Sequence, residues 1–386
     1  MKNYIRFHII DYGKEEEKAV RNVFKSKWLT TGRKTREFEK MFMKYSDAKY
    51  CVALNSCTAG MHLSLIVNEI KKGDKVLVPS LTFCSTVNVI IHIGAEPVFV
   101  DVKNSDFTID LELAEKMLKK DKKIKAIMPV HYAGAVCDMD YLMKLKRKYG
   151  VKIIQDSAHC IEGKWRGKGV AYYGDSASFS FYATKNITTG EGGICAFNNS
   201  KKTELARILS LHGLSADAWK RYDTDGSPFY SVKFPGYKYN MSDIQAALGM
   251  AQLKKINKFY KIRKKLYLTY KNYLSEFDGL RFQEFDKRSS PAYHLFVVDL
   301  NTKESGIKRD DLIKEFKKEK IGYSVHFIPV HMHKFYRKHF KYSVIEKLDV
   351  TERLSRDIIS LPFHTKIKEN DIKRVVSCFK RVYLKR

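Results

Sequence analysis

The sequence lacks any apolar run that approaches the ~20 residues needed to span a bilayer. Its beginning also lacks the apolar stretch of a secretory signal, because an acidic cluster occupies residues 15–17. A hydrophobic content of 44% beside 30% charged residues argues against a disordered chain. We therefore expect a soluble, globular, cytoplasmic protein without a membrane partner.

Paired cysteine motifs are missing as well. The seven cysteines are scattered along the chain, none belongs to a CxxC pair, and most have apolar neighbours. This pattern is typical of buried thiols. We therefore expect free cysteines and no metal site.

Acidic residues are few: 43 Asp and Glu stand against 72 Lys and Arg, which gives a formal charge of +29. Such a charge could favour nucleic acid, but the lysines are dispersed over helical faces, as in residues 254–273, and no RNA or DNA module accompanies them. A solvated lysine-rich surface is favoured, with no nucleic-acid partner. A non-catalytic basic binding protein remains an alternative. The positive field would also attract an anionic small substrate.

From about residue 50 the chain alternates short apolar runs with helical patterns. The runs that read as strands are YCVALNS, KVLVPS, EPVFVDV, IKAIMPVH and VKIIQDSAH. This alternation predicts an α/β fold with a mainly parallel sheet covered by helices on both faces, and ligands at the carboxyl ends of the strands. Two more strands, over 177–183 and 193–199, suggest a locally antiparallel edge or hairpin.

A long helical pattern begins near residue 241 and continues towards 275, where it could bridge to a second domain. Strands over 293–300 and 323–327, with helices around them, then fit a small α+β domain. We place a large domain at 1–255 and a small C-terminal domain at 256–386.

Two segments suggest where a phosphorylated cofactor could bind. VALNSCTAGMHL places small residues at a predicted helix N-terminus, which attracts phosphate, although Ser56 or Thr58 could simply cap the helix. VKIIQDSAH places Asp156 at the end of an apolar strand, where a carboxylate needs a cation or donors. One such cation is the protonated ring nitrogen of pyridoxal phosphate. A cap formed by Asp156 or Ser157 is an equal alternative.

Two further segments add an amine and an amide. In FSFYATKN, Ser180 and Lys185 flank a predicted strand end, and the glycines of TTGEGG permit a close backbone approach. A partly desolvated lysine can form an imine with a carbonyl, although a surface lysine is the commoner case. In PGYKYNMSDIQAA, Asn240 precedes the long helix, where it or Ser242 could be a cap.

Six motifs occur in a fixed order: NSCTAGMH, PSLTF, PVHYAG, QDSAH, FSFYATKNITTGEGG and PGYKYNMSDIQAA. In this order they resemble the sugar-nucleotide aminotransferases of the DegT/DnrJ/StrS type, and the resemblance covers most of the chain. It implies the aspartate-aminotransferase fold and pyridoxal 5'-phosphate as cofactor. PVHYAG, the lysine motif and GYKYN most resemble members that aminate C4 of a nucleotide-linked keto sugar. Amination at C3 is the alternative.

The resemblance also implies roles around the cofactor ring. Lys185 would form the internal aldimine, and Asp156 would pair with the pyridine nitrogen. His159 would lie near the phenolic oxygen, and Phe83 of PSLTF would stack on the ring. The phosphate would be held by Cys57, Thr58 and Ser180.

The remaining implied roles concern the substrate and the assembly. Asn240 would reach the phosphate of the neighbouring subunit, which implies a homodimer with shared active sites. The sugar would lie near Thr31, Arg33, His326 and His331, although a core or surface histidine is as good an explanation for the last two. Glutamate is the implied amino donor, and Lys185 would move the proton. Two half-reactions with pyridoxamine phosphate between them predict ping-pong kinetics, in surface glycan biosynthesis.

Overall fold

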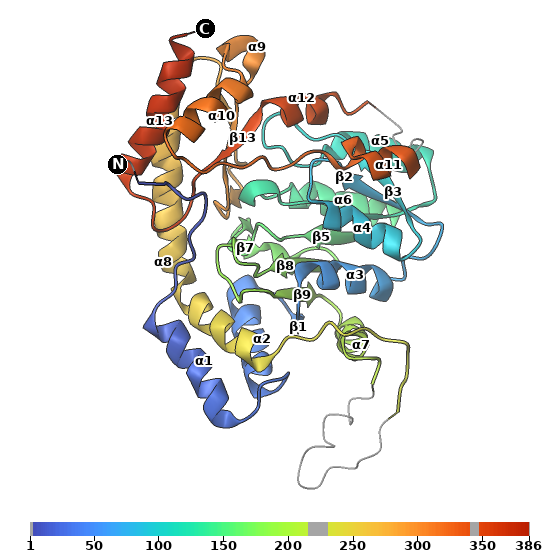
Figure 1. Cartoon of the computed structure of the whole chain (residues 1–386). Coiled ribbons are helices and arrows are strands. Elements are labelled where there is room, and N and C mark those ends of the chain that lie inside the picture. Colours follow the sequence, from blue (N-terminus) through green and yellow to red (C-terminus); the bar gives the residue numbers. More distant parts are fainter. Residues whose placement is uncertain (1–2, 215–230, 340–346, 386) are drawn as a thin grey trace.

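A seven-stranded sheet occupies the centre of the larger part of the molecule (Figure 1), in the order β1-β9-β8-β5-β4-β2-β3. The computed structural model describes residues 3–214, 231–339 and 347–385. The strands of this sheet are β1 (Tyr50–Leu54), β2 (Lys75–Pro79), β3 (Glu96–Val100), β4 (Ile124–Ile127), β5 (Lys152–Asp156), β8 (Ser176–Ser180) and β9 (Gly193–Phe197). The predicted α/β architecture with a mainly parallel sheet is confirmed.

One strand departs from the parallel arrangement. β9 pairs antiparallel with both β8 and β1, whereas the other neighbouring pairs are parallel. Of the predicted antiparallel edge or hairpin over 177–183 and 193–199, the antiparallel pairing is confirmed, and β9 lies inside the sheet rather than at its edge. β1 takes the edge, because it runs back along the free side of β9 and satisfies the hydrogen-bonding groups there.

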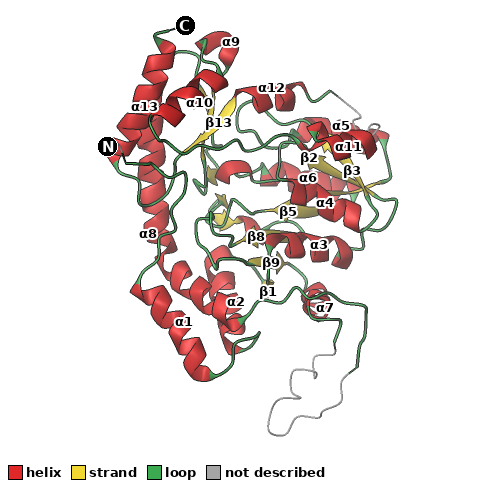
Figure 2. Ribbon diagram, in the orientation of Figure 1, coloured by secondary structure: helices red, strands yellow, loops and turns green. Residues whose placement is uncertain are grey.

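Alternate strand residues face opposite helical layers, as the two-residue period of a strand requires. Leu77 of β2 packs in the core that includes Phe38 and Phe42, whereas Val76 and Val78 pack in the core on the other face. The helices on the first face are α2 (Arg33–Ser46), α5 (Leu111–Lys120) and α6 (Met139–Tyr149). Those on the second face are α3 (Cys57–Val67), α4 (Cys84–His92) and α7 (Ser200–Ser210). Figure 2 shows the helices on both sides of the strands.

The predicted long helix is α8 (Asp243–Leu274), which runs along one side of the molecule from α1 (Lys14–Ser26) and α2 up to α13 (Glu369–Tyr383) (Figure 1). Up to Phe259 its buried residues belong to the core under the large sheet, and from Leu266 onward they belong to a second core. The second core also contains Ile5 of the N-terminal segment. The division at residue 255 falls within α8 and stays a prediction.

The second core is built mainly by the C-terminal segments. Its sheet has the order β10-β12-β13, with strands β10 (Arg281–Phe282), β12 (Phe296–Asp299) and β13 (Ile358–Leu361).

The remaining elements of the described chain belong to neither of these two sheets. The strands and helices among them are β6 (Lys164–Trp165), β7 (Lys168–Gly169), β11 (Ser289–Ser290), α1 (Lys14–Ser26), α9 (Thr302–Ser305), α10 (Arg309–Lys318), α11 (Lys334–His339), α12 (Asp349–Asp357) and α13 (Glu369–Tyr383). Short 3₁₀ turns occur at Tyr132–Gly134, Val170–Tyr172 and Val330–Met332.

The prediction of a strand over 323–327 is wrong. This segment makes only an isolated bridge between Ser324 and Ser360 of β13. The hydroxyl of Tyr132 donates a hydrogen bond to the carbonyl of His326. All seven cysteines are free, as predicted. Within the described ranges, no helix has the length and apolarity to cross a membrane.

Candidate active site

Four chain segments bring polar side chains to the carboxyl edge of the large sheet. β1 leads into α3, β2 leads into α4, β5 ends at Asp156, and β8 leads into the turn that contains Lys185. These four strands are parallel to one another, so their carboxyl ends meet at one edge. The edge therefore gathers Lys185, Asp156 and the N-terminus of α3, which separate sequence motifs had suggested.

Lys185 is half-buried in the turn after β8, where its backbone N–H donates to the carbonyl of Tyr182 at 2.9 Å. Burial lowers the pKa of its amine, while the nearby Cys57 and Asp156 act in the opposite direction. Within residues 3–214, 231–339 and 347–385, no hydrogen bond or ion pair engages its Nζ. The amine is thus partly desolvated, which favours its uncharged, nucleophilic form.

Asp156 ends β5 and is 4% exposed. Its Oδ2 accepts from the hydroxyl of Thr86 at 2.7 Å, and its Oδ1 accepts from the backbone N–H of Ala158 at 3.0 Å. Burial raises the pKa of this carboxyl, although both hydrogen bonds and Lys185 oppose that shift. No lysine or arginine of the described chain forms an ion pair with it. The turn-capping alternative accounts for only one of its two oxygens.

His159 is buried beside Lys185, three residues after Asp156. Its Nδ1 accepts from the backbone N–H of Ala133 at 3.2 Å. Burial, with Lys185 and His326 nearby, holds its pKa well below the ordinary value, so the ring is neutral. A neutral imidazole that accepts at Nδ1 carries its proton at Nε2. His159 can therefore donate a hydrogen bond from Nε2.

The N-terminus of α3 offers free donors. Ser56 is the N-cap of this helix, because its Oγ accepts a hydrogen bond from the backbone N–H of Ala59 at 3.1 Å. The carbonyl of Ser56 accepts from the backbone N–H of Gly60 at 3.3 Å. Among the described residues nothing accepts from the N–H groups of Cys57 and Thr58. Gly193 allows the close approach behind this turn, because a Cβ there would lie 2.3 Å from the carbonyl carbon of Ser56.

Two predicted residues flank this edge. Phe83 precedes α4 and is 57% exposed, with its ring 5.8 Å from that of Phe327. Ser180 ends β8, and its Oγ accepts from the backbone N–H of Tyr182 at 3.3 Å. An exposed aromatic ring and a partly free hydroxyl are both available to a ligand.

Among the described residues, no hydrogen bond or ion pair joins Thr31, Arg33 or Asn240 to Lys185. The side-chain amide of Asn240 donates to Thr31 Oγ1 at 2.7 Å, and both residues line a cavity of about 430 Å³. Arg33 points outward with 87% of its side chain exposed and pairs with Glu37 at 2.7 Å. The cap of α8 is Ser242, whose Oγ accepts from the N–H of Gln245 at 3.3 Å.

The two predicted histidines, His326 and His331, lie in different surroundings. His326 is near Lys185, and burial lowers its pKa to about 4, while its Nδ1 lies 2.8 Å from Ser360 Oγ. His331 instead contacts Ser80 at 2.7 Å and lies 3.4 Å from Glu352. His326 therefore lies near Lys185, whereas His331 lies between the end of β2 and helix α12.

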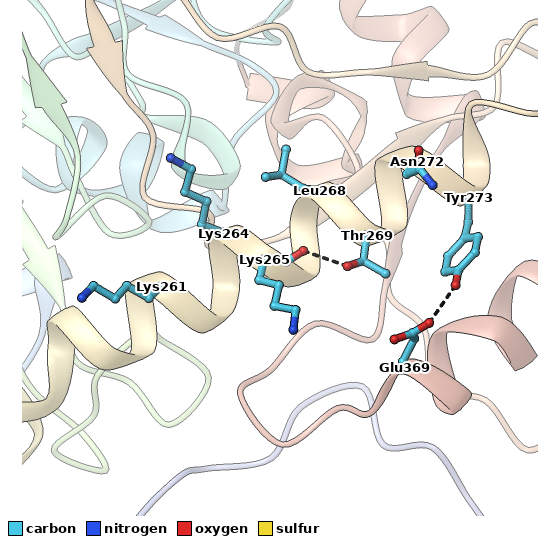
Figure 3. A pocket seen from close by; sticks show the side chains of 8 residues that line it. All are labelled: Lys261, Lys264, Lys265, Leu268, Thr269, Asn272, Tyr273 and Glu369. Carbon is cyan, nitrogen blue, oxygen red and sulfur yellow. Dashed lines mark hydrogen bonds between the residues drawn. The ribbon is translucent and has the colours of Figure 1, made fainter.

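Figure 3 shows a different hollow, of about 580 Å³, on the outward face of α8. It is lined by Lys261, Lys264, Lys265, Leu268, Thr269, Asn272, Tyr273 and Glu369. None of the predicted site residues borders it. The sequence reasoning missed Thr86, His294 and Phe327, which contact Asp156, His159 and Phe83. Of these three residues, only Thr86 could have been suspected from the sequence, because it lies three positions after the PSLTF motif.

Comparison with protein families gives one match over nearly the whole chain. The model described as "DegT/DnrJ/EryC1/StrS aminotransferase family" matches residues 11–380. The chain is 38% identical over 383 residues to the spore coat polysaccharide biosynthesis protein SpsC of Bacillus subtilis, covering 98% of each protein.

Solved structures agree with this match. Spr1654 of Streptococcus pneumoniae, assigned as a sugar aminotransferase, superposes in its pyridoxal phosphate form with a TM-score of 0.89 at 30% identity over 99% of both chains. It has also been solved in a pyridoxamine phosphate form. PseC of Helicobacter pylori, an aminotransferase involved in the biosynthesis of pseudoaminic acid, gives a TM-score of 0.89 at 26% identity over 100% of both chains. The aspartate-aminotransferase fold is thereby confirmed.

Proposed function

The chain belongs to the DegT/DnrJ/EryC1/StrS aminotransferase family, and from this premise we propose that it converts a nucleotide-linked 4-keto sugar into a 4-amino sugar. It is a pyridoxal-phosphate-dependent enzyme of the sugar aminotransferase group. The proposed donor is an amino acid, with glutamate as the first candidate, and the proposed setting is surface glycan biosynthesis. The observation that carries the proposal is Lys185, which is half-buried, has no ion-pair partner in the described part of the chain and lies beside a buried Asp156.

The chain's own residues fit the cofactor. Asp156 is a buried carboxylate for which the described chain supplies hydrogen bonds but no ion pair, and a protonated ring nitrogen would supply the missing charge. The free N–H groups of Cys57 and Thr58, at a helix N-terminus, suit its phosphate. The exposed ring of Phe83 suits stacking on a flat aromatic ring.

When bound, pyridoxal phosphate supplies an aldehyde that bonds to amines and a ring that takes up the electron pair released at the donor's α-carbon. Lys185 would bond to that aldehyde and, once freed by the donor, move a proton at Nζ. Its lowered pKa suits this task, because an amine must be uncharged to accept a proton. Asp156 would hold the ring nitrogen in its protonated form, and His159 would donate from Nε2 to the phenolic oxygen.

The acceptor and the assembly are proposed on separate grounds. The formal charge of +29 favours attraction of an anionic acceptor, as a nucleotide-linked sugar is. The choice of C4 over C3 rests on the resemblance of PVHYAG, the lysine motif and GYKYN. For Asn240, which borders the cavity beside Thr31 rather than Lys185, we propose a contact with the phosphate in the neighbouring subunit of a homodimer.

The test is a transamination assay with glutamate and a panel of nucleotide-linked 3-keto and 4-keto sugars, read by mass spectrometry of the aminated product. Lys185→Ala should lose turnover by at least ~10³-fold, because it lacks the amine that bonds to the cofactor and moves the proton. Lys264→Ala, in the hollow of Figure 3, is the matched control and should keep full activity. Full activity of Lys185→Ala would exclude the proposed role, and amination of the 3-keto sugars alone would exclude C4.

A further inference from the structure

Glu162 is a buried carboxyl that the roles above do not use. It is 4% exposed, and both of its oxygens accept from the side-chain amide of Asn186, at 2.9 and 2.8 Å. No lysine or arginine in the described part of the chain lies within ion-pair distance of it. Burial of a carboxyl without an ion pair is unfavourable unless other groups compensate. The charge of Arg263 acts on Glu162, and the amide of Asn186 is the side-chain donor to both of its oxygens.

The surroundings of Asn186 leave its amide only one orientation. Its Nδ2 also donates to the carbonyl of Ala292 at 2.8 Å. In the reversed orientation, Oδ1 would face the carbonyl oxygen of Ala292, which can only accept, whatever the protonation state of Glu162. Nδ2 must therefore point towards Glu162, and Oδ1 must point towards His294, whose Nδ1 lies 2.9 Å away.

This orientation decides which nitrogen of His294 carries the proton. An amide oxygen can only accept, so Nδ1 of His294 must donate. His294 is 4% exposed, and burial, with His159 and Lys185 nearby, holds its pKa well below the ordinary value. The ring is thus neutral and its Nε2 has no hydrogen. No described residue donates to that nitrogen.

The ordered ring of His294 lies directly against the candidate site. Its centroid is 4.3 Å from that of His159, with an angle of 34° between the ring planes. His159 has the opposite tautomer, since it accepts at Nδ1 from Ala133. Asn186 is also the residue that follows Lys185 and is only 7% exposed, so fixing its side chain fixes the backbone next to the lysine.

We propose that Glu162, Asn186 and His294 form a positioning network for Lys185. Glu162 orients the amide of Asn186, and that amide fixes the tautomer and the ring plane of His294. His294 in turn fixes the ring of His159. This inference rests on the proposed function in one respect, namely that Lys185 and His159 are the residues that meet the cofactor.

The test compares Asn186→Leu, Glu162→Gln and the double variant as holoenzymes. Histidine 15N NMR distinguishes the two tautomers of each ring, and a difference spectrum with His294→Phe assigns the signal among the 12 histidines. The wild-type His294 should carry its proton at Nδ1. Asn186→Leu should move part or all of that proton to Nε2. It should also lower kcat on the order of 10- to 100-fold while the KM for the keto sugar changes less than ~3-fold, because positioning rather than binding is lost.

The double variant tests whether the residues act in series. If Glu162 acts through Asn186, the double variant should be no worse than Asn186→Leu. Additive losses, or an unchanged His294 tautomer in Asn186→Leu, would overturn the proposal. If Asn186→Leu does not fold, Glu162→Gln alone decides, because its amide places a donor against Asn186 and should shift the same NMR signal; no shift would overturn the proposal.

Glu115→Gln is the matched control. Glu115 is also a buried carboxyl, 8% exposed, which accepts from Tyr141, Lys148 and Tyr149 between α5 and α6. It should leave the His294 signal and kcat unchanged. The NMR measurement needs neither donor nor acceptor, so an inactive wild-type protein with the expected tautomers would reject the proposed function and leave the network standing.

Discussion

Replacing Glu162 by glutamine should change how the stability of this protein depends on pH. Burial raises the pKa of the Glu162 carboxyl from 4.5 to about 7. The folded state therefore binds this proton more tightly than the unfolded state does. The resulting stability is fully present below pH 4.5 and is lost as the pH rises through about 7. The difference between 4.5 and about 7, at about 1.4 kcal/mol for each pH unit, corresponds to about 3.5 kcal/mol.

Glutamine at this position has no proton to lose. The unfolding free energy of Glu162→Gln minus that of the wild type should therefore increase by about 3 kcal/mol between about pH 4 and pH 8. The buried His131 and the half-buried His8 and His326, whose pKa values burial lowers to about 4, give the opposite slope. They are present in both proteins, so their contribution cancels in the difference.

Urea denaturation of the apoproteins, followed by the fluorescence of the three tryptophans, measures this difference. Both proteins must be studied at one concentration, because association would shift the apparent stability. A difference that is constant from pH 4 to pH 8, or one that decreases as the pH rises, would refute the argument. It would mean that the folded state does not hold the Glu162 proton more tightly.

Thr86→Val removes the hydroxyl that donates to Asp156 and should raise the pKa of that carboxyl further. The acid limb of the kcat profile should move up by about one pH unit, since a hydrogen bond to a charged group contributes about 1.5 kcal/mol; an unmoved limb would contradict the proposed role of Asp156. Arg207→Ala leaves Glu39, which is 6% exposed, without the guanidinium that donates to it at 2.9 and 3.0 Å. We expect a loss of about 2 kcal/mol in urea denaturation, against less than about 0.5 kcal/mol for Lys314→Ala in an exposed pair; equal losses would show that the burial of Glu39 does not matter.

Much of the fold could be predicted from local patterns. Apolar runs of strand length alternate with helical periods, and this alone predicts a parallel sheet with helices on both faces. Asp156 at the end of one run and Lys185 beyond another then had to reach the same edge, because parallel strands share their carboxyl ends. The place of β9 between β1 and β8 could not be predicted, since strand order depends on partners far apart in the sequence.

The sequence by itself determined the family, the sheet and the identity of the lysine, because each is encoded in motifs of adjacent residues. Only the tertiary structure decided which side chains surround that lysine. Thr86 meets Asp156 across 70 positions, and Asn186 meets His294 across 108. These hydrogen bonds require donor and acceptor atoms about 3 Å apart. The number of residues between two positions in the sequence does not determine that distance, because it depends on how the chain packs.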